Sequence, residues 1–185
     1  MLQPLLDPTR DHIFGWQFAP IELVQYGDLQ CPHCAAVYPD IKRLQEIMGD
    51  LLKFAFRHHP LPQIHPLALD AAIACEMAAL QDKFWHMHDI IFENQQHLSR
   101  ADLLRFAEEI EMDTTLLIDT REYKKMSQKV IGDFESGVRS GANGTPTFFI
   151  NGLRYNGMND LEGLLAACNY TMLMLEAELK QPAQN

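Results

Sequence analysis

Two short motifs far apart in the chain constrain its fold more than any other feature. The first is Cys31-Pro32-His33-Cys34, and the second is Thr145-Pro146, which opens an apolar run that ends at Asn151-Gly152. Two cysteines three residues apart at the start of a helix lie on one side of its first turn, where a disulfide can close and the helix dipole stabilises a thiolate. A proline at the first position of a strand breaks no interior ladder bond, and X-Pro is where cis bonds occur. The two motifs together predict dithiol redox chemistry beside a strand that opens with a proline suited to a cis bond.

The residues around the cysteine motif predict a βαβ unit. The segment 21–26 mixes β-branched and aromatic residues and stops at Gly27-Asp28, which is typical of a strand. A helical apolar pattern then runs to Gly49-Asp50, and a second strand is expected over 51–57. Strand, helix and strand at this length indicate a parallel pair.

A block of helices then interrupts the β pattern. We expect helices over about 67–80, 83–94, from Ser99, from about 112, and over 122–140. The last of these places four residues on one stripe, namely Met126, Val130, Phe134 and Val138. The β pattern returns over 147–155 with a hairpin at Asn151-Gly152, and a helix over 160–179 follows.

This order predicts an α/β fold in which a helical block is inserted between two halves of one sheet, because 148–155 is too little sheet to stand alone. We expect residues 11–60 and 142–179 to form one discontinuous domain and 61–141 to form the inserted helical subdomain. Residues 1–10 and 180–185 are expected to be flexible termini.

Charge and hydropathy exclude several classes of partner. A formal net charge of −10 argues against nucleic acid and anionic membrane surfaces. No apolar run reaches the roughly 18 residues needed to span a membrane. The first ten residues lack the features of a secretory signal, so we expect a cytoplasmic protein, or a periplasmic one if a leader has been removed.

The cysteine motif has a metal-binding alternative. A structural zinc site needs four ligands, commonly a second CxxC or a matching pair of histidines, and the sequence has neither. We therefore expect no metal. Cys75 and Cys168 each lie in a helical apolar pattern, where a lone cysteine behaves as a small hydrophobic residue.

For redox chemistry each residue of the motif has an expected role. Cys31 is the more exposed nucleophile at the helix N-cap, and Cys34 is the buried resolving thiol. Pro32 presets the backbone for the helix start without losing an amide donor. His33 can stabilise the Cys31 thiolate, which makes the pair more oxidising, although a solvated side chain on an exposed turn is the alternative.

These motifs resemble the DsbA-like branch of the thioredoxin superfamily, whose single-domain members are often bacterial. The resemblance covers about residues 11 to 168 and is carried by the two motifs and by 11–15, 24–28, Phe84-Trp85 with Met87-His88, and 143–148. It implies a thioredoxin fold with an inserted helical subdomain. It also implies that Pro146 is cis and packs against the cysteines, and that the backbone of Thr145 pairs with an extended substrate.

One position departs from the family pattern. Such proteins usually carry Asp or Glu six residues before the first cysteine, where it accepts the proton of the resolving thiol. This chain has Gln25, and Glu22 lies an odd number of residues away, on the opposite face of the strand. Gln25 therefore occupies the position from which the proton of Cys34 would be accepted, but it carries an amide where the family usually has a carboxylate.

The resemblance implies a thiol:disulfide oxidoreductase that exchanges the Cys31–Cys34 pair with protein or small-molecule thiols and disulfides through a mixed disulfide at Cys31. No cofactor beyond the redox-active disulfide is expected. Two alternatives remain. One is a glutathione-dependent transferase or isomerase, whose site is usually centred on a serine, and the other is a non-enzymatic binding module.

Overall fold

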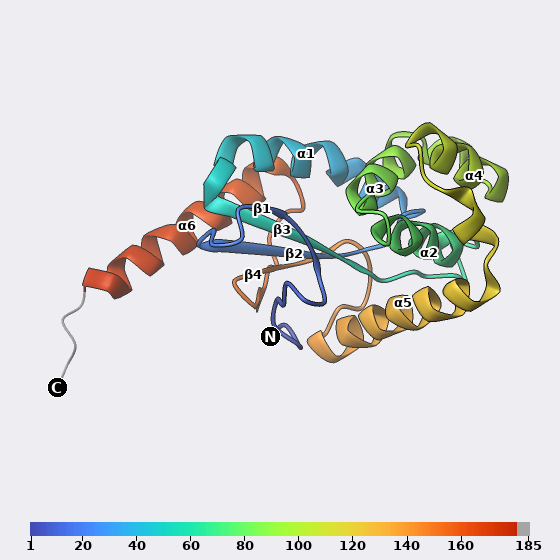
Figure 1. The fold of residues 1–185 in the computed structure, drawn as a ribbon. Coiled ribbons are helices and arrows are strands. Elements are labelled where there is room, and N and C mark those ends of the chain that lie inside the picture. Colours follow the sequence, from blue (N-terminus) through green and yellow to red (C-terminus); the bar gives the residue numbers. More distant parts are fainter. Residues whose placement is uncertain (181–185) are drawn as a thin grey trace.

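The computed structural model describes residues 1–180, and its framework is a five-stranded mixed sheet with helices on both faces (Figure 1). The strands have the order β1-β3-β2-β4-β5. Their bounds are β1 (His12–Gly15), β2 (Ile21–Gly27), β3 (Leu52–His58), β4 (Thr147–Ile150) and β5 (Leu153–Arg154). Only β2 and β3 pair in parallel among these strands, which confirms the predicted βαβ unit, and β4 and β5 form the predicted hairpin.

Six α-helices accompany the sheet in the described residues. They are α1 (Pro32–Met48), α2 (Ala68–Ala79), α3 (Phe84–Glu93), α4 (Arg100–Glu109), α5 (Thr120–Ser140) and α6 (Leu161–Lys180). The short helix expected near residue 112 is a 3-10 turn, η3 (Thr114–Ile118), and two further turns are η1 (Gly49–Leu51) and η2 (Gln95–His97). Helices α2 to α5 lie between β3 and β4 in sequence, so the predicted insertion between two halves of one sheet is confirmed.

The two faces of β2 belong to two different cores. Ile21 and Leu23 pack with α1 and α6, whereas Val24 and Tyr26 pack on the opposite side. Helix α5 runs along that opposite side (Figure 1), where the Tyr26 hydroxyl lies 2.8 Å from the Ser136 hydroxyl. Because side chains alternate along a strand, Gln25 shares the α1 face with Leu23.

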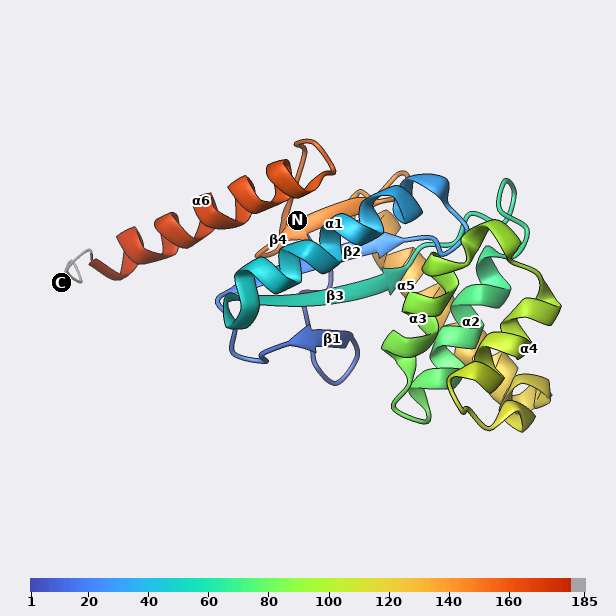
Figure 2. The same cartoon turned by 90° about the horizontal axis from the view of Figure 1, so that it is seen from above.

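Helices α2, α3 and α4 gather at one end of the sheet, and α6 extends away from the other end (Figure 2). Helix α5 reaches from this group back across the sheet and contacts both α2 and β3. Among residues 1–180, none of the helices has both the length and the apolar character needed to cross a bilayer.

The N-terminal segment is held against the sheet, in contrast to the expected flexible terminus at 1–10. Leu2 is 2% exposed and its backbone N–H donates to the Gly152 carbonyl at 2.8 Å. The Arg57 guanidinium donates to the carbonyls of Pro4 and Leu5 at 2.9 and 3.1 Å. These contacts use backbone carbonyls, which leave no pattern in the sequence. At the other end Lys180 closes α6, and the expected flexible residues 181–185 lie outside the described residues.

The expected stripe on α5 is wrong at its C-terminal end. Val138 is 56% exposed, whereas Asp133, Gly137 and Ser140 are buried together with Val130. Steps of four residues drift by about 40° each around a helix of 3.6 residues per turn, so a stripe drawn only in fours leaves the packed face. The true face alternates steps of four and three, and it includes polar residues that the apolar pattern does not mark.

A cluster of ionisable groups around the buried Glu76 side chain, here called the Glu76 cluster, ties α2 and α5 to the sheet. The Glu76 carboxylate lies 3.0 Å from Nε2 of His12, 3.1 Å from Nε2 of His58 and 3.6 Å from Nζ of Lys129. Burial raises the pKa of Glu76, but its contacts with His12, His58 and Lys129 outweigh this and hold the pKa well below its usual range. The carboxylate is therefore ionised and links α2 to β1, β3 and α5.

We expect Glu76→Gln to destabilise the protein by about 3 kcal/mol, because the neutral amide loses the charge-assisted contacts that hold the buried side chain to His12 and His58. Urea unfolding measures this. The matched control is Glu46→Gln, whose side chain is 66% exposed and whose pair with Arg43 lies on the surface. Equal stability of the two variants would contradict the structural role of the Glu76 cluster.

Candidate active site

The cysteine motif lies at the N-terminus of α1, where Cys31 is the N-cap residue and Pro32 begins the helix. Proline is suited to this position because the first helical N–H has no partner within the helix. The Cys31 N–H donates to the Asp28 carbonyl at 3.1 Å, which holds the turn between β2 and α1. Both thiols are reduced and covered, with Cys31 3% and Cys34 0% exposed, so the expected difference in their exposure is small.

The two thiols differ much more in charge than in exposure. A hydrogen bond from the Cys34 thiol lowers the pKa of Cys31 to about 5, although burial acts in the opposite direction. The Thr145 side chain and the backbone N–H groups of Cys34 and His33 lower this pKa further. Burial, followed by the same contact with Cys31, raises the pKa of Cys34 well above its usual value. At neutral pH the pair therefore consists of a Cys31 thiolate and a Cys34 thiol.

The second motif meets the first across a groove. The Thr145–Pro146 peptide bond is cis, and Sγ of Cys31 lies 3.5 Å from the Thr145 carbonyl oxygen. The Thr145 hydroxyl is buried and bonds to no other group among the described residues, which leaves it to act on the nearby Cys31 sulfur and lower the pKa of that thiol. A cavity of about 280 Å³ opens beside them, lined by His33, Ala36, Val37, Thr145, Pro146 and Asn159. The structure thus brings both motifs to one site.

His33 is exposed at this groove. Its backbone N–H is among the groups that lower the pKa of Cys31. The expected stabilisation of the thiolate by the imidazole ring stays a prediction.

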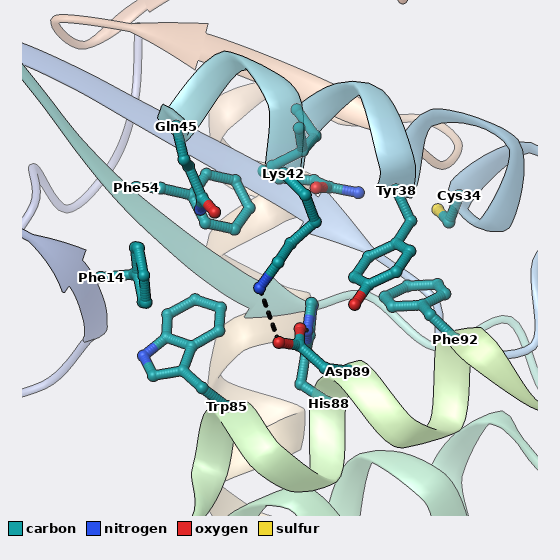
Figure 3. A pocket seen from close by; sticks show the side chains of 12 residues that line it. Phe14, Cys34, Tyr38, Lys42, Gln45, Phe54, Trp85, His88, Asp89 and Phe92 are labelled. Atoms are coloured by element: carbon teal, nitrogen blue, oxygen red, sulfur yellow. Dashed lines mark hydrogen bonds and ion pairs between the residues drawn. The ribbon is translucent and has the colours of Figure 1, made fainter. Parts of the chain in front are cut away.

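Gln25 is 3% exposed and lines a small cavity together with Cys34. Figure 3 shows Cys34 at this cavity with Tyr38 and Phe92 beside it. The position of Gln25 places its amide on the face of the sheet that α1 covers. An amide has no proton-accepting group of the strength of a carboxylate, so the side chain cannot act as the base that the family's acidic residue supplies.

The helical block holds the loop that precedes Cys31. The Gln95 amide in η2 donates to the carbonyls of Leu29 and Cys31 at 2.9 and 3.1 Å. Nδ1 of His65 lies 2.8 Å from the carboxylate of Asp28, which is 1% exposed. Sequence reasoning did not identify these three residues, because their partners are backbone carbonyls or lie far away in the chain.

Cys75 and Cys168 lie in the core, as their apolar surroundings suggest, and both are 0% exposed. Burial raises the pKa of Cys168 to about 12 and that of Cys75 well above its usual value, so both stay protonated at neutral pH. Within residues 1–180 no group of three or more His, Cys, Asp or Glu side chains is arranged to hold a metal ion.

The family profile described as thioredoxin matches residues 8–169. The Na(+)/H(+) antiporter NhaA 3 of Salinispora tropica is 38% identical over 164 residues, which are 88% of this chain and 25% of the relative. NhaA 1 of Mycolicibacterium gilvum is 40% identical over 169 residues, or 90% of this chain and 27% of the relative. The chain spans about a quarter of the length of these curated relatives.

Two solved structures illustrate the likeness in fold. The thiol-disulfide exchange protein alpha-DsbA2 from Wolbachia pipientis superposes with a TM-score of 0.77 at 23% identity, covering 89% of this chain and 88% of that one. Oxidised BdbD from Bacillus subtilis gives a TM-score of 0.78 at 21% identity, covering 90% and 95%. At this identity the likeness establishes the thioredoxin-like fold with its helical insertion.

Removing the Cys34 thiol should raise the pKa of Cys31 from about 5 toward the ordinary thiol value of ~8.5, because that thiol is the main donor to the Cys31 sulfur. Cys34→Ala should show the rise, and Cys34→Ser, which keeps a donor, should not. The rate of alkylation by iodoacetamide against pH measures both. Cys168→Ala is the control, and equal midpoints in the Ala and Ser variants would contradict the assigned hydrogen bond.

Thr145→Val should also raise the pKa of Cys31 while preserving the fold, since valine has nearly the shape of threonine but lacks the hydroxyl that serves the thiolate. The change should be smaller than that of Cys34→Ala. Thiolate absorbance against pH gives the midpoint, and Thr147→Val, which changes a hydroxyl that bonds the Gly144 carbonyl instead, is the matched control. A larger effect at Thr147 than at Thr145 would overturn this assignment.

Proposed function

The chain belongs to the thioredoxin family, and from this premise we propose that it is a DsbA-like thiol:disulfide oxidoreductase that acts through Cys31 and Cys34. The observation that carries the proposal is the opposite displacement of the two thiol pKa values within one helical turn. A stable thiolate beside a protonated thiol is the arrangement that thiol–disulfide exchange requires of a nucleophile and its resolving partner.

The reaction proceeds through a mixed disulfide at Cys31. In the oxidising direction a substrate thiolate attacks Sγ of Cys31 in the Cys31–Cys34 disulfide, and Cys34 leaves as a thiolate that takes up a proton. A second substrate thiolate then attacks the substrate sulfur and releases Cys31. In the reducing direction Cys31 attacks the substrate disulfide and Cys34 resolves the mixed disulfide. A low pKa of Cys31 stabilises the reduced protein and so makes the disulfide a stronger oxidant.

The groove beside Thr145 and Pro146 is the proposed substrate site. Its position next to Sγ of Cys31 supports this, as does its volume of about 280 Å³. An extended peptide adding to the backbone of Thr145 would present a cysteine to Cys31, with His33 at the rim. The exchange needs no cofactor besides the dithiol.

We also propose a division of the chain into two parts. Residues 11–60 and 142–179 carry the two motifs, and 61–141 form the inserted subdomain whose Gln95 and His65 hold the loop before Cys31. The insertion therefore supports the site as well as enlarging the protein.

The two alternatives make different predictions for turnover. A glutathione-dependent transferase or isomerase would depend on a single centre, so loss of Cys34 would leave it active. A binding module would catalyse no reduction of insulin. Both are less consistent with two thiols whose pKa values are displaced in opposite directions.

A second candidate function concerns a partner. Several relatives named as Na(+)/H(+) antiporters contain a segment similar to about nine-tenths of this chain within a much longer protein. Such an arrangement supports the proposal that this chain acts on a cation transporter of the membrane. Capture of a transporter by Cys34→Ser from solubilised membranes, with none captured by Cys31→Ser, tests it, and capture of soluble proteins alone would contradict it.

The proposed function predicts that Cys34→Ser accumulates mixed disulfides with substrate proteins and that Cys31→Ser does not. Non-reducing electrophoresis after lysis in acid measures the trapped species. The double variant Cys75→Ala/Cys168→Ala is the control and should reduce insulin within about twofold of the wild-type rate, because both thiols are fully buried and stay protonated. Equal trapping by Cys31→Ser would reverse the roles, and absence of insulin reduction by the wild type would contradict the enzymatic function.

A further inference from the structure

The loop between β5 and α6 closes around the side chain of Tyr155. The Tyr155 hydroxyl donates a hydrogen bond to the Met158 carbonyl at 2.9 Å. Gly157 and Gly163 lie so close to this side chain that a Cβ atom at either position would overlap the hydroxyl. The two glycines therefore allow the loop to wrap tightly around one aromatic residue.

The end of the loop is fixed to the helices on both sides of it. Oδ1 of Asp160 accepts a hydrogen bond from the Gly163 N–H at 2.8 Å, which caps the start of α6. The Leu161 N–H donates to Oδ2 of Asp40 on α1 at 3.2 Å. Because α1 also carries His33, the loop has a fixed position relative to the α1 side of the groove.

Asn159 lies between these fixed points and lines the groove together with Thr145 and Pro146. Its side chain is exposed, and Nδ2 donates to the Pro146 carbonyl at 3.5 Å, which makes a long and weak hydrogen bond. A side-chain amide has two N–H donors and a carbonyl acceptor. Within residues 1–180 no other group bonds the Asn159 amide, so one N–H and the oxygen remain available to a ligand in the groove.

The edge of the sheet is unpaired at the same place. Strand β5 pairs with the last two residues of β4, and the Tyr155 N–H donates to the Phe148 carbonyl at 2.9 Å. The Pro146 carbonyl comes two residues earlier, beyond the end of β5, and Asn159 is its partner there. An extended chain can add at this point, because the edge of a sheet offers backbone donors and acceptors.

We propose that Asn159 selects extended peptides as substrates by hydrogen-bonding one peptide group of the chain that adds beside Thr145; this inference rests on the proposed oxidoreductase function. The free N–H of Asn159 donates to the carbonyl of that peptide group, and Oδ1 accepts from its N–H. A small disulfide without peptide groups gains nothing from these bonds. Asn159 thus determines specificity and takes no part in the exchange of sulfur atoms.

Two mixed disulfides of thionitrobenzoate test the proposal. One contains a short capped peptide with a central cysteine, and the other contains 2-mercaptoethanol. In each case the Cys31 thiolate attacks the sulfur of the peptide or of mercaptoethanol, and thionitrobenzoate leaves with the electron pair of the broken S–S bond. Its absorbance gives the second-order rate constant. Cys34 then attacks Sγ of Cys31 and releases the peptide or mercaptoethanol as a thiolate.

The ratio of the two rate constants, peptide over mercaptoethanol, measures selection for a peptide. We expect this ratio to fall about tenfold in Asn159→Ala, since one or two hydrogen bonds ordinarily contribute that much. Asn159→Leu should show the same fall, because leucine keeps contact area but lacks the amide. Asn156→Ala, exposed in the same loop and outside the groove lining, is the matched control and should keep the wild-type ratio.

N-methylation of the peptide identifies the group that Asn159 binds. When the peptide nitrogens on each side of the cysteine are methylated one at a time, at least one position should slow the wild type about tenfold. In Asn159→Ala that methylation should have no effect, because the partner of the lost N–H is already missing. Methylation effects that are equal in the two proteins at every position would overturn the proposal.

The Cys31 midpoint separates recognition from a disturbed thiol. It should stay at about 5 in Asn159→Ala, because Asn159 is not among the groups that lower this pKa. A changed midpoint together with a changed ratio would assign the effect to the thiol and overturn the role of Asn159.

Failure of this role and failure of the proposed function give different results. A wild type that releases no thionitrobenzoate from either disulfide would contradict the oxidoreductase function. A wild type that reacts with both, together with Asn159→Ala and Asn159→Leu variants that keep its ratio, would overturn the role of Asn159 alone.

Discussion

The hydrogen bond from the Cys34 thiol to the Cys31 sulfur is the interaction on which the rest of the site depends. It makes two chemically identical groups unequal, because one sulfur carries the charge and the other keeps the proton. The start of α1 supplies backbone N–H groups to the charged sulfur, and the core buries the protonated one. Burial alone would have raised both pKa values, so the direction of the Cys31 shift comes from donors aimed at that atom.

Holding those donors in place requires the two halves of the fold to meet. Strand β2 delivers the chain to Cys31, and the segment before β4 brings the Thr145 hydroxyl from more than a hundred residues away in sequence to the same sulfur. The inserted helices fix the connecting loop through Gln95 and the Asp28–His65 contact, and the Glu76 cluster fixes the helices to the sheet. A change in the insertion can therefore alter thiol chemistry without touching either cysteine.

The sequence predicts the local elements of this arrangement but not the polar contacts between residues far apart in the chain. Alternation over 21–26 and the Asn151-Gly152 turn predicted β2 and the hairpin, since both signals depend on neighbours in the chain. Strand β1 was missed because four residues ending in glycine carry little pattern. The roles of Gln95 and Asp28 could not be foreseen either, because their partners are set by tertiary packing.

The proposed chemistry requires that Cys34 keeps its proton while Cys31 is ionised. Titration of the reduced protein with ¹³C label at the cysteine Cβ atoms observes both thiols separately in one sample. We expect Cys31 to titrate with a midpoint of about 5 and Cys34 to remain protonated beyond the midpoint of an ordinary thiol. Titration of both cysteines together near the ordinary thiol pKa would contradict the account.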